Sequence, residues 1–350
     1  MAEPMGEFER IRALIADLPD GDGVVVGPGD DAAVLRPHVG HDLVVTTDTF
    51  VEGRHFRREL LSPTELGARF AAANLSDLAA MAARPCWATL ALVLPESWSA
   101  AAMQAFEHSC ARALAADGAA IVGGNLASGD TFSATLTLIG QAPRGEAWLR
   151  SGARDGDVIA VTGVPGSAAA FTALALWGSP PSRERVPVSL VERFVAPASR
   201  VGLASALART GAVHAAIDLS DGLAADLGHV GEASGVGANI EADALPADEA
   251  LRAAARQLSA WAGQERGVLP AAETGVRSHL ILGPSDDYEL LLAIDPAGFE
   301  ACARLAEGAG ATLTAIGRFT AERGLRLVSG GATTPITPHG WDHFGANPRV

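Results

Sequence analysis

Hydrophobic and polar positions along the chain follow two periods, and these periods predict a mixture of helices and strands. Apolar residues recur at helical spacing within 7–18, which predicts a short amphipathic helix. A capping box at 62–65, with proline at the first helical position, predicts a helix that runs to about Ala82. The other expected helices are 99–116, 167–177, 219–233 and 299–308, and the expected strands are 43–45, 87–94, 119–122, 131–141, 158–162, 213–217, 279–282, 288–294, 312–319 and 325–328.

Helices and strands mix along the whole chain, so the expected fold class is α/β (α+β). The 350 residues are enough for two domains, and 48% hydrophobic with 19% charged residues is a globular composition. The segment 143–157 is rich in Gly, Arg and Asp and is the expected linker. The sequence therefore predicts an N-terminal domain at 1–145 and a C-terminal α/β domain at 146–350.

The charge balance excludes several classes of partner and enzyme. With 26 basic and 41 acidic residues the net charge is −15, so neither nucleic acid nor a membrane is an expected partner. Every basic residue is arginine, so the chain has no Schiff-base, P-loop or protein-kinase lysine. The three cysteines form no CxxC pair and the first residues lack a secretion signal, which favours the cytoplasm.

Acidic and hydroxyl residues gather in short motifs near predicted strand ends. Such oxygen donors suit Mg²⁺, which prefers few carboxylates together with water and substrate phosphates. Each motif also has a structural interpretation, because Gly-Asp-Asp forms turns and Ser or Asp caps helices. Their recurrence at successive strand ends favours a ligand site. The motifs are Gly29-Asp30-Asp31, Thr46-Thr47-Asp48, Asn74 with Asp77, Gly123-Gly124-Asn125, Asp218–Gly222 and Ser285-Asp286-Asp287.

These segments resemble the thiamine-monophosphate kinase family of the aminoimidazole-ribonucleotide-synthetase-like superfamily. Any one segment alone is a weak signal, whereas their shared order over nearly the whole chain is specific. The matching stretches are Gly29–Ala32, Thr46–Thr49, Glu52-Gly53, His55-Phe56, Asn74–Met81, Arg150–Ala153, Val161–Gly163, Ile217–Leu223, Asp287–Leu290 and Gly340–Phe344.

The resemblance implies transfer of the γ-phosphoryl group of ATP to thiamine monophosphate, with several Mg²⁺ ions, in a two-domain homodimer joined through its N-terminal domains. The metal ligands that it implies are Asp30, Asp31, Thr46, Thr47, Asp48, Asp77, Asn125, Asp218 and Asp221. The implied ATP contacts are Gly124, Asn125, Arg150 and Ser220. The implied substrate contacts are His55, Asp286 and Trp341, of which Trp341 could stack on the thiamine ring or pack in the core.

A phosphate acceptor is already anionic, so no covalent nucleophile or general base is expected in the site. The chemical obstacle is repulsion between two polyanions, which bound cations and Arg150 would reduce. The sequence departs from the family pattern at three places, namely Asn125 in place of Asp, Asp286 in place of Glu, and no aromatic residue near Asp117. Two alternatives therefore stay open: a non-catalytic paralogue that binds nucleotide or thiamine phosphate, and another ATP-using enzyme of the superfamily.

Overall fold

The chain folds into two compact units, one formed by residues 1–78 and 82–147 and the other by residues 79–81 and 148–350. The computed structural model describes residues 14–15, 18, 21–29, 31–177, 180–262, 272–338 and 340. Of the helix expected over 7–18, Leu14 and Ile15 are helical and most of the rest lies outside the described residues. No helix in those ranges is long and apolar enough to span a membrane.

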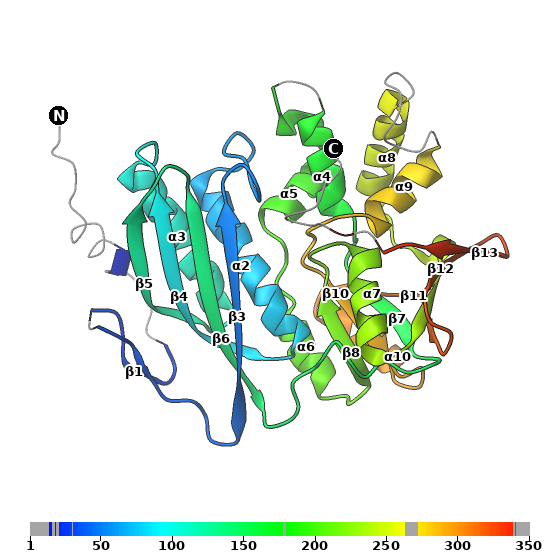
Figure 1. Ribbon diagram of the computed structural model, residues 1–350, viewed down its shortest axis with the longest axis horizontal. Coiled ribbons are helices and arrows are strands. Elements are labelled where there is room, and N and C mark those ends of the chain that lie inside the picture. Colours follow the sequence, from blue (N-terminus) through cyan, green and yellow to red (C-terminus); the bar gives the residue numbers. More distant parts are fainter. Residues whose placement is uncertain are drawn as a thin grey trace. The chain divides into compact units, whose positions relative to one another are not determined.

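The first unit is built on a four-stranded sheet in the order β3-β6-β4-β5 (Figure 1). The strands are β3 (His41–Val51), β6 (Ser133–Pro143), β4 (Arg84–Leu94) and β5 (Ala120–Ser128), and only β4 and β5 pair in parallel. Two helices, α2 (Pro63–Ala80) and α3 (Ala100–Ala116), lie on one face of this sheet (Figure 1). A short ribbon of β1 (Val24–Val26) and β2 (Val34–Leu35) precedes it.

The two faces of this sheet differ in burial. Alternate side chains of β6, such as Leu136 and Leu138, are completely buried and pack towards the helices. On the opposite face of β3, Leu43 is 52% exposed and Val45 is 60% exposed. The first unit therefore presents a partly apolar sheet face that neither α2 nor α3 covers.

The second unit has a seven-stranded sheet in the order β13-β12-β9-β11-β7-β10-β8. Its central strands β7 and β10 are buried along their whole length, as expected of strands covered on both faces. The strands are β7 (Val158–Thr162), β8 (Val213–Asp218), β9 (Gly237–Glu241), β10 (Leu290–Ile294), β11 (Leu313–Thr320), β12 (Leu325–Ser329) and β13 (Ala332–Ile336). The helices are α4 (Ser167–Leu176), α5 (Val188–Val195), α6 (Val201–Ala208), α7 (Leu223–Ser234), α8 (Glu249–Ala262), α9 (Glu273–Leu282) and α10 (Phe299–Gly308).

Several of the expected elements differ from the structure, among them the strand expected at 43–45, which is the longer β3. Residues 279–282, expected as a strand, are the last turn of helix α9, because a short apolar run fits a buried helix as well as a strand. Helix α7 begins at Leu223 rather than at 219, since Leu219 is hydrogen-bonded to the segment before β10. Strand β5 does not end at Val122 but continues to Ser128 through its parallel pairing with β4.

Candidate functional site

In the first unit, strand β3 and helix α2 bring a threonine and two aspartates together. Thr46 and Asp48 lie on the covered face of β3, opposite the buried Leu138 and Leu136 of β6. The Thr46 hydroxyl donates a hydrogen bond of 2.6 Å to the carboxylate of Asp77 on α2. Three residues predicted from two separate motifs thus form one cluster, although Thr46 and Asp48 lie within β3 rather than at its end.

The electrostatics of this cluster disfavour negative charge. Burial, and secondly the nearby Asp77 carboxylate, raise the pKa of Asp48 to about 6 from its ordinary 3.8. A neighbouring arginine guanidinium would instead lower the pKa of Asp48, because it would stabilise the carboxylate. Two half-buried carboxylates that repel one another beside a hydroxyl oxygen are a donor set that fits a hard divalent cation.

Thr47 lies on the other face of the same strand. Its hydroxyl donates to the Leu136 carbonyl oxygen at 3.2 Å and lies 3.1 Å from the Thr137 hydroxyl. The structure therefore does not bring the Thr47 side chain to Asp48. Asp31 is exposed in the connection between β1 and β2, and Asp30 lies outside the described residues.

Gly124 and Asn125 are exposed in the middle of β5. A Cβ atom at Gly124 would lie 2.0 Å from the Leu90 carbonyl oxygen on β4, so only glycine allows the two strands to approach this closely. Asn125 pairs with Ala91 in the same parallel ladder. The glycine therefore has a structural reason to be present, and Asn125 is left as an exposed amide beside it.

His55 is oriented by its own turn. Its Nδ1 atom accepts the Val51 backbone N–H at 3.0 Å, and its ring stacks on Phe50 at a centroid separation of 5.7 Å. Because Nδ1 is an acceptor, the proton of the neutral ring is on Nε2. His55 is thus held as an Nε2 donor, which suits a phosphate oxygen.

In the second unit, the predicted residues gather at one edge of the seven-stranded sheet. Asp218 ends β8 and pairs with Leu290 at the start of β10, and it is only 3% exposed. The following loop is joined to the segment before β10, because the Leu219 N–H donates to the Glu289 carbonyl oxygen at 2.7 Å and the Tyr288 N–H donates to the Leu219 carbonyl oxygen at 2.9 Å. These bonds fix the chain between Asp218 and Ser220.

Asp226 is a buried carboxyl of this site that the sequence motifs did not single out. It lies in the first turn of α7 and accepts the backbone N–H groups of Asp221 and Gly222 at 3.2 and 3.0 Å. Burial, followed by the charges of Asp218 and Asp221, raises its pKa to about 8. The sequence signal that could have identified Asp226 is an acidic residue in the first turn of a helix that follows a glycine.

The segment before β10 is held by half-buried side chains. The Asp287 carboxylate accepts the Gly166 and Ala168 N–H groups at the start of α4, at 2.6 and 2.8 Å, and burial raises its pKa to about 6. Arg200 makes two hydrogen bonds of 2.6 Å to the Glu289 carboxylate. Tyr288, which lies between Asp287 and Glu289 in the chain, has a φ of 55°, a left-handed conformation that its neighbours must enforce. Asp286 is half-buried in this fixed segment.

Arg150 precedes a loop that is tied to the end of α7. The Ser234 hydroxyl donates to the Arg150 carbonyl oxygen at 3.2 Å and accepts the Gly152 and Ala153 N–H groups at 3.1 Å. The exposed side chain of Arg150 therefore extends from a fixed backbone. Trp341 lies outside the described residues.

Gly340, directly before Trp341, contacts the Asp218–Gly222 loop and the start of α7. A Cβ atom at Gly340 would lie 3.1 Å from the Asp221 Cβ and 2.6 Å from the Ala225 Cβ. The start of the last matching motif is thus in direct contact with the Asp218–Gly222 loop.

Within either unit, the described residues form no group of three or more His, Cys, Asp or Glu side chains arranged to hold a metal ion alone. The donors present are carboxylates and hydroxyls, which fit Mg²⁺ when water and phosphate oxygens complete its coordination. The chemistry of the donor set therefore fits magnesium bound together with a phosphate ligand.

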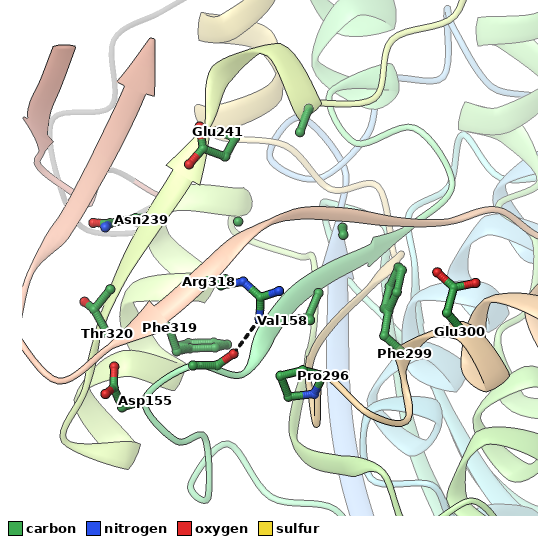
Figure 2. A pocket seen from close by; sticks show the side chains of 14 residues that line it. Asp155, Val158, Asn239, Glu241, Pro296, Phe299, Glu300, Arg318, Phe319 and Thr320 are labelled. Carbon is green, nitrogen blue, oxygen red and sulfur yellow. Dashed lines mark hydrogen bonds between the residues drawn. The ribbon is translucent and has the colours of Figure 1, made fainter. Parts of the chain in front are cut away.

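Two cavities open in the second unit. The larger, about 700 Å³, is lined by residues of the inner strands β7, β9 and β11 and of the chain after β10, such as Asn239, Glu241, Phe299 and Arg318 (Figure 2). It contains none of the residues that the motifs predicted. The smaller, about 380 Å³, is lined by Arg200, Asp287 and Glu289 at the start of α4.

Two family models match the chain, with the descriptions AIR synthase related protein, N-terminal domain, over residues 29–142, and AIR synthase related protein, C-terminal domain, over residues 154–330. The thiamine-monophosphate kinase of Salmonella typhimurium is 36% identical over 341 residues, which cover 96% of this chain and 95% of that protein. The crystal structure of thiamine-monophosphate kinase from Stenotrophomonas maltophilia has 35% identity and a TM-score of 0.76, covering 95% of this chain and 98% of that one.

A second similar structure is AaThiL complexed with AMPPCP and TMP. It is 25% identical, with a TM-score of 0.71, and the match covers 97% of both chains. The matches in sequence and in structure extend across both units. The chain belongs to the thiamine-monophosphate kinase family, within the AIR synthase related proteins.

Proposed function

We propose that the protein phosphorylates thiamine monophosphate with ATP and forms thiamine diphosphate. The observation that carries this proposal is the 36% identity to a thiamine-monophosphate kinase over 96% of the chain. A related structure complexed with AMPPCP, a methylene analogue of ATP, and TMP supports the pair of substrates. The carboxylates of each unit supply a chemical reason for phosphoryl transfer, because they are candidate ligands for the Mg²⁺ that would neutralise the phosphates.

Charge, rather than proton transfer, is the obstacle in this reaction. The acceptor phosphate is an anion at neutral pH and needs no general base. Two unit charges 4 Å apart repel by about 1 kcal/mol in water and by about 4 kcal/mol at the effective dielectric of a protein surface. The site must therefore neutralise and align two phosphate groups for direct in-line transfer, without a phospho-enzyme.

Each unit contributes its own candidate ligands for Mg²⁺. Asp31, Thr46, Asp48 and Asp77 belong to the first unit, together with Asp30, Thr47 and Asn125 from the family motifs. Asp218 and Asp221 belong to the second. Bound magnesium supplies positive charge to the phosphate oxygens. The repulsion between Asp48 and Asp77 is the feature of the protein that favours such a cation.

The remaining residues of the family motifs are the proposed nucleotide and substrate contacts. Exposed Gly124, Asn125 and Arg150 and half-buried Ser220 are the proposed ATP contacts. The proposed substrate contacts are His55, which presents Nε2–H, together with Asp286 and Trp341. Arg150 offers a planar set of N–H donors for phosphate oxygens in a chain that has no lysine.

We also propose a homodimer joined through the uncovered face of the first unit's sheet, in the cytoplasm. Leu43 and Val45 are more than half exposed there, beside the paired threonines Thr47–Thr137 and Thr49–Thr135. Exposed apolar side chains on a flat sheet face are typical of a protein interface. A second chain would cover them.

A non-catalytic binding protein is the second candidate, favoured by Asn125 and Asp286 where the family pattern has Asp and Glu. Incubation with Mg·ATP and thiamine monophosphate, followed by chromatography of thiamine diphosphate, separates the two. The kinase forms thiamine diphosphate from thiamine monophosphate, and unphosphorylated thiamine in a parallel reaction gives none. Tight binding of both ligands without product would favour the binding protein and contradict the proposal.

A further inference from the structure

Asp226 is a carboxyl group for which the family motifs give no role. It is 1% exposed, and a single oxygen, Oδ2, accepts the backbone N–H groups of both Asp221 and Gly222. These two peptides form the end of the loop that carries Asp218, Ser220 and Asp221. The Asp226 side chain therefore contacts the backbone of a candidate metal ligand, Asp221.

The rest of this loop is fixed by other contacts. Its first half is bonded to the backbone of Tyr288 and Glu289, as described above. At its end, a Cβ atom at Gly222 would lie 2.1 Å from the Gly283 carbonyl oxygen, so the loop is pressed against the chain after α9. Gly222 also has a φ of 114°, which a residue with a side chain rarely adopts. The Asp221 peptide lies between these anchors, and Asp226 is the side chain that orients it.

The chemistry of the acceptor is also informative. A neutral amide could accept the same two N–H groups without adding charge, whereas a carboxylate makes stronger, charge-assisted hydrogen bonds. The shared Oδ2 acceptor of Asp226 therefore fixes the orientation of the Asp221 and Gly222 amides.

We propose that Asp226 is a positioning residue, which directs the Asp221 carboxylate towards bound magnesium by holding the Asp221 and Gly222 amides. The inference rests on the proposed function, because it takes Asp221 to be a ligand of the metal–nucleotide. Residues that hold metal ligands in place typically change metal affinity about 10–100-fold when they are replaced.

The test is the affinity for Mn²⁺ in the presence of AMPPCP, measured by electron paramagnetic resonance without turnover. We expect D226A to bind Mn²⁺ about 10-fold more weakly or worse. D226N, which keeps an acceptor oxygen, should lie between D226A and the wild type. The matched control is E232Q, an exposed acid near the end of the same helix, and it should bind as the wild type does.

Thermal unfolding in EDTA separates positioning from stability alone. A folded D226A variant whose Mn²⁺ affinity is within twofold of wild type would overturn the inference. If D226A does not fold, D226N decides, and unchanged Mn²⁺ affinity in D226N would then overturn it. A wild-type protein that binds Mn²⁺ with AMPPCP but forms no thiamine diphosphate contradicts the proposed kinase activity, while the comparison of variants still tests Asp226.

Discussion

Replacing Asp48 with asparagine should stabilise the metal-free protein while it impairs the site. Asp48 is a half-buried acid whose pKa is raised to about 6 by burial and by Asp77. In the unfolded chain the same carboxyl group titrates near its ordinary 3.8. Above pH 6 the folded protein therefore holds a carboxylate that is more stable in the unfolded state. Asparagine keeps the shape of the aspartate side chain and removes its negative charge.

The magnitude follows from the two pKa values. Between a pKa of 3.8 and one of about 6 the folded state binds the proton more tightly, so stability falls as pH rises through this interval. At about 1.4 kcal/mol for each pH unit, the full cost is about 3 kcal/mol at pH 8. At pH 4 most of the group is still protonated in the folded state and the cost falls below about 1 kcal/mol. D48N should therefore gain up to about 3 kcal/mol at pH 8 and little at pH 4.

The assay must report on the first unit alone. Hydrogen exchange of peptides from β3 and α2, followed in increasing urea with EDTA, gives the local free energy of unfolding at each pH. D130N is the matched control, since Asp130 is exposed in a connection of the same unit and its replacement should change stability by less than about 0.5 kcal/mol. No gain for D48N at pH 8, or an equal gain at pH 4, would refute the electrostatic reasoning.

Three further outcomes are expected. R200M removes the guanidinium that binds the Glu289 carboxylate. It should lower the free energy of unfolding in urea by about 3–5 kcal/mol. A loss under about 1 kcal/mol would show that the Arg200–Glu289 pair does not stabilise the fold. G124A forces a Cβ against the Leu90 carbonyl oxygen and should cost about 1–3 kcal/mol in the same experiment, whereas an unchanged urea midpoint would argue against the close approach. V45D places a charge on the uncovered sheet face. Light scattering of this variant should give the mass of one chain. A mass of two chains, which we propose for the wild type, would contradict the proposed interface.

The sequence predicted those elements best whose hydrophobic pattern is complete within the element. Helix α10 and strand β7 have the bounds that their periodicity indicated. The run at 279–282 failed because four apolar residues fit either structure, and the choice depends on packing against the rest of the second unit. Strands β9 and β13, and helices α5, α6 and α8, were not expected at all.

The candidate site was predictable in composition and not in geometry. The motif around Thr46 and the motif around Asp77 are on one surface, as their common chemistry suggested, and the 2.6 Å hydrogen bond between them confirms their proximity. Strand alternation alone separates the Thr47 side chain from Asp48. The contact of Asp226 with the Asp221 amide could not be predicted, because it depends on where α7 begins.

The central claim is that carboxylates hold magnesium against the phosphates that react. Its most direct test is the initial rate of thiamine diphosphate formation at saturating Mg²⁺ in wild type, D48N and D218N, with D130N as the control. We expect D48N and D218N to lose at least about 100-fold in rate, although hydrogen exchange shows both to be folded, and D130N to keep the wild-type rate. Rates near wild type in both D48N and D218N would contradict it.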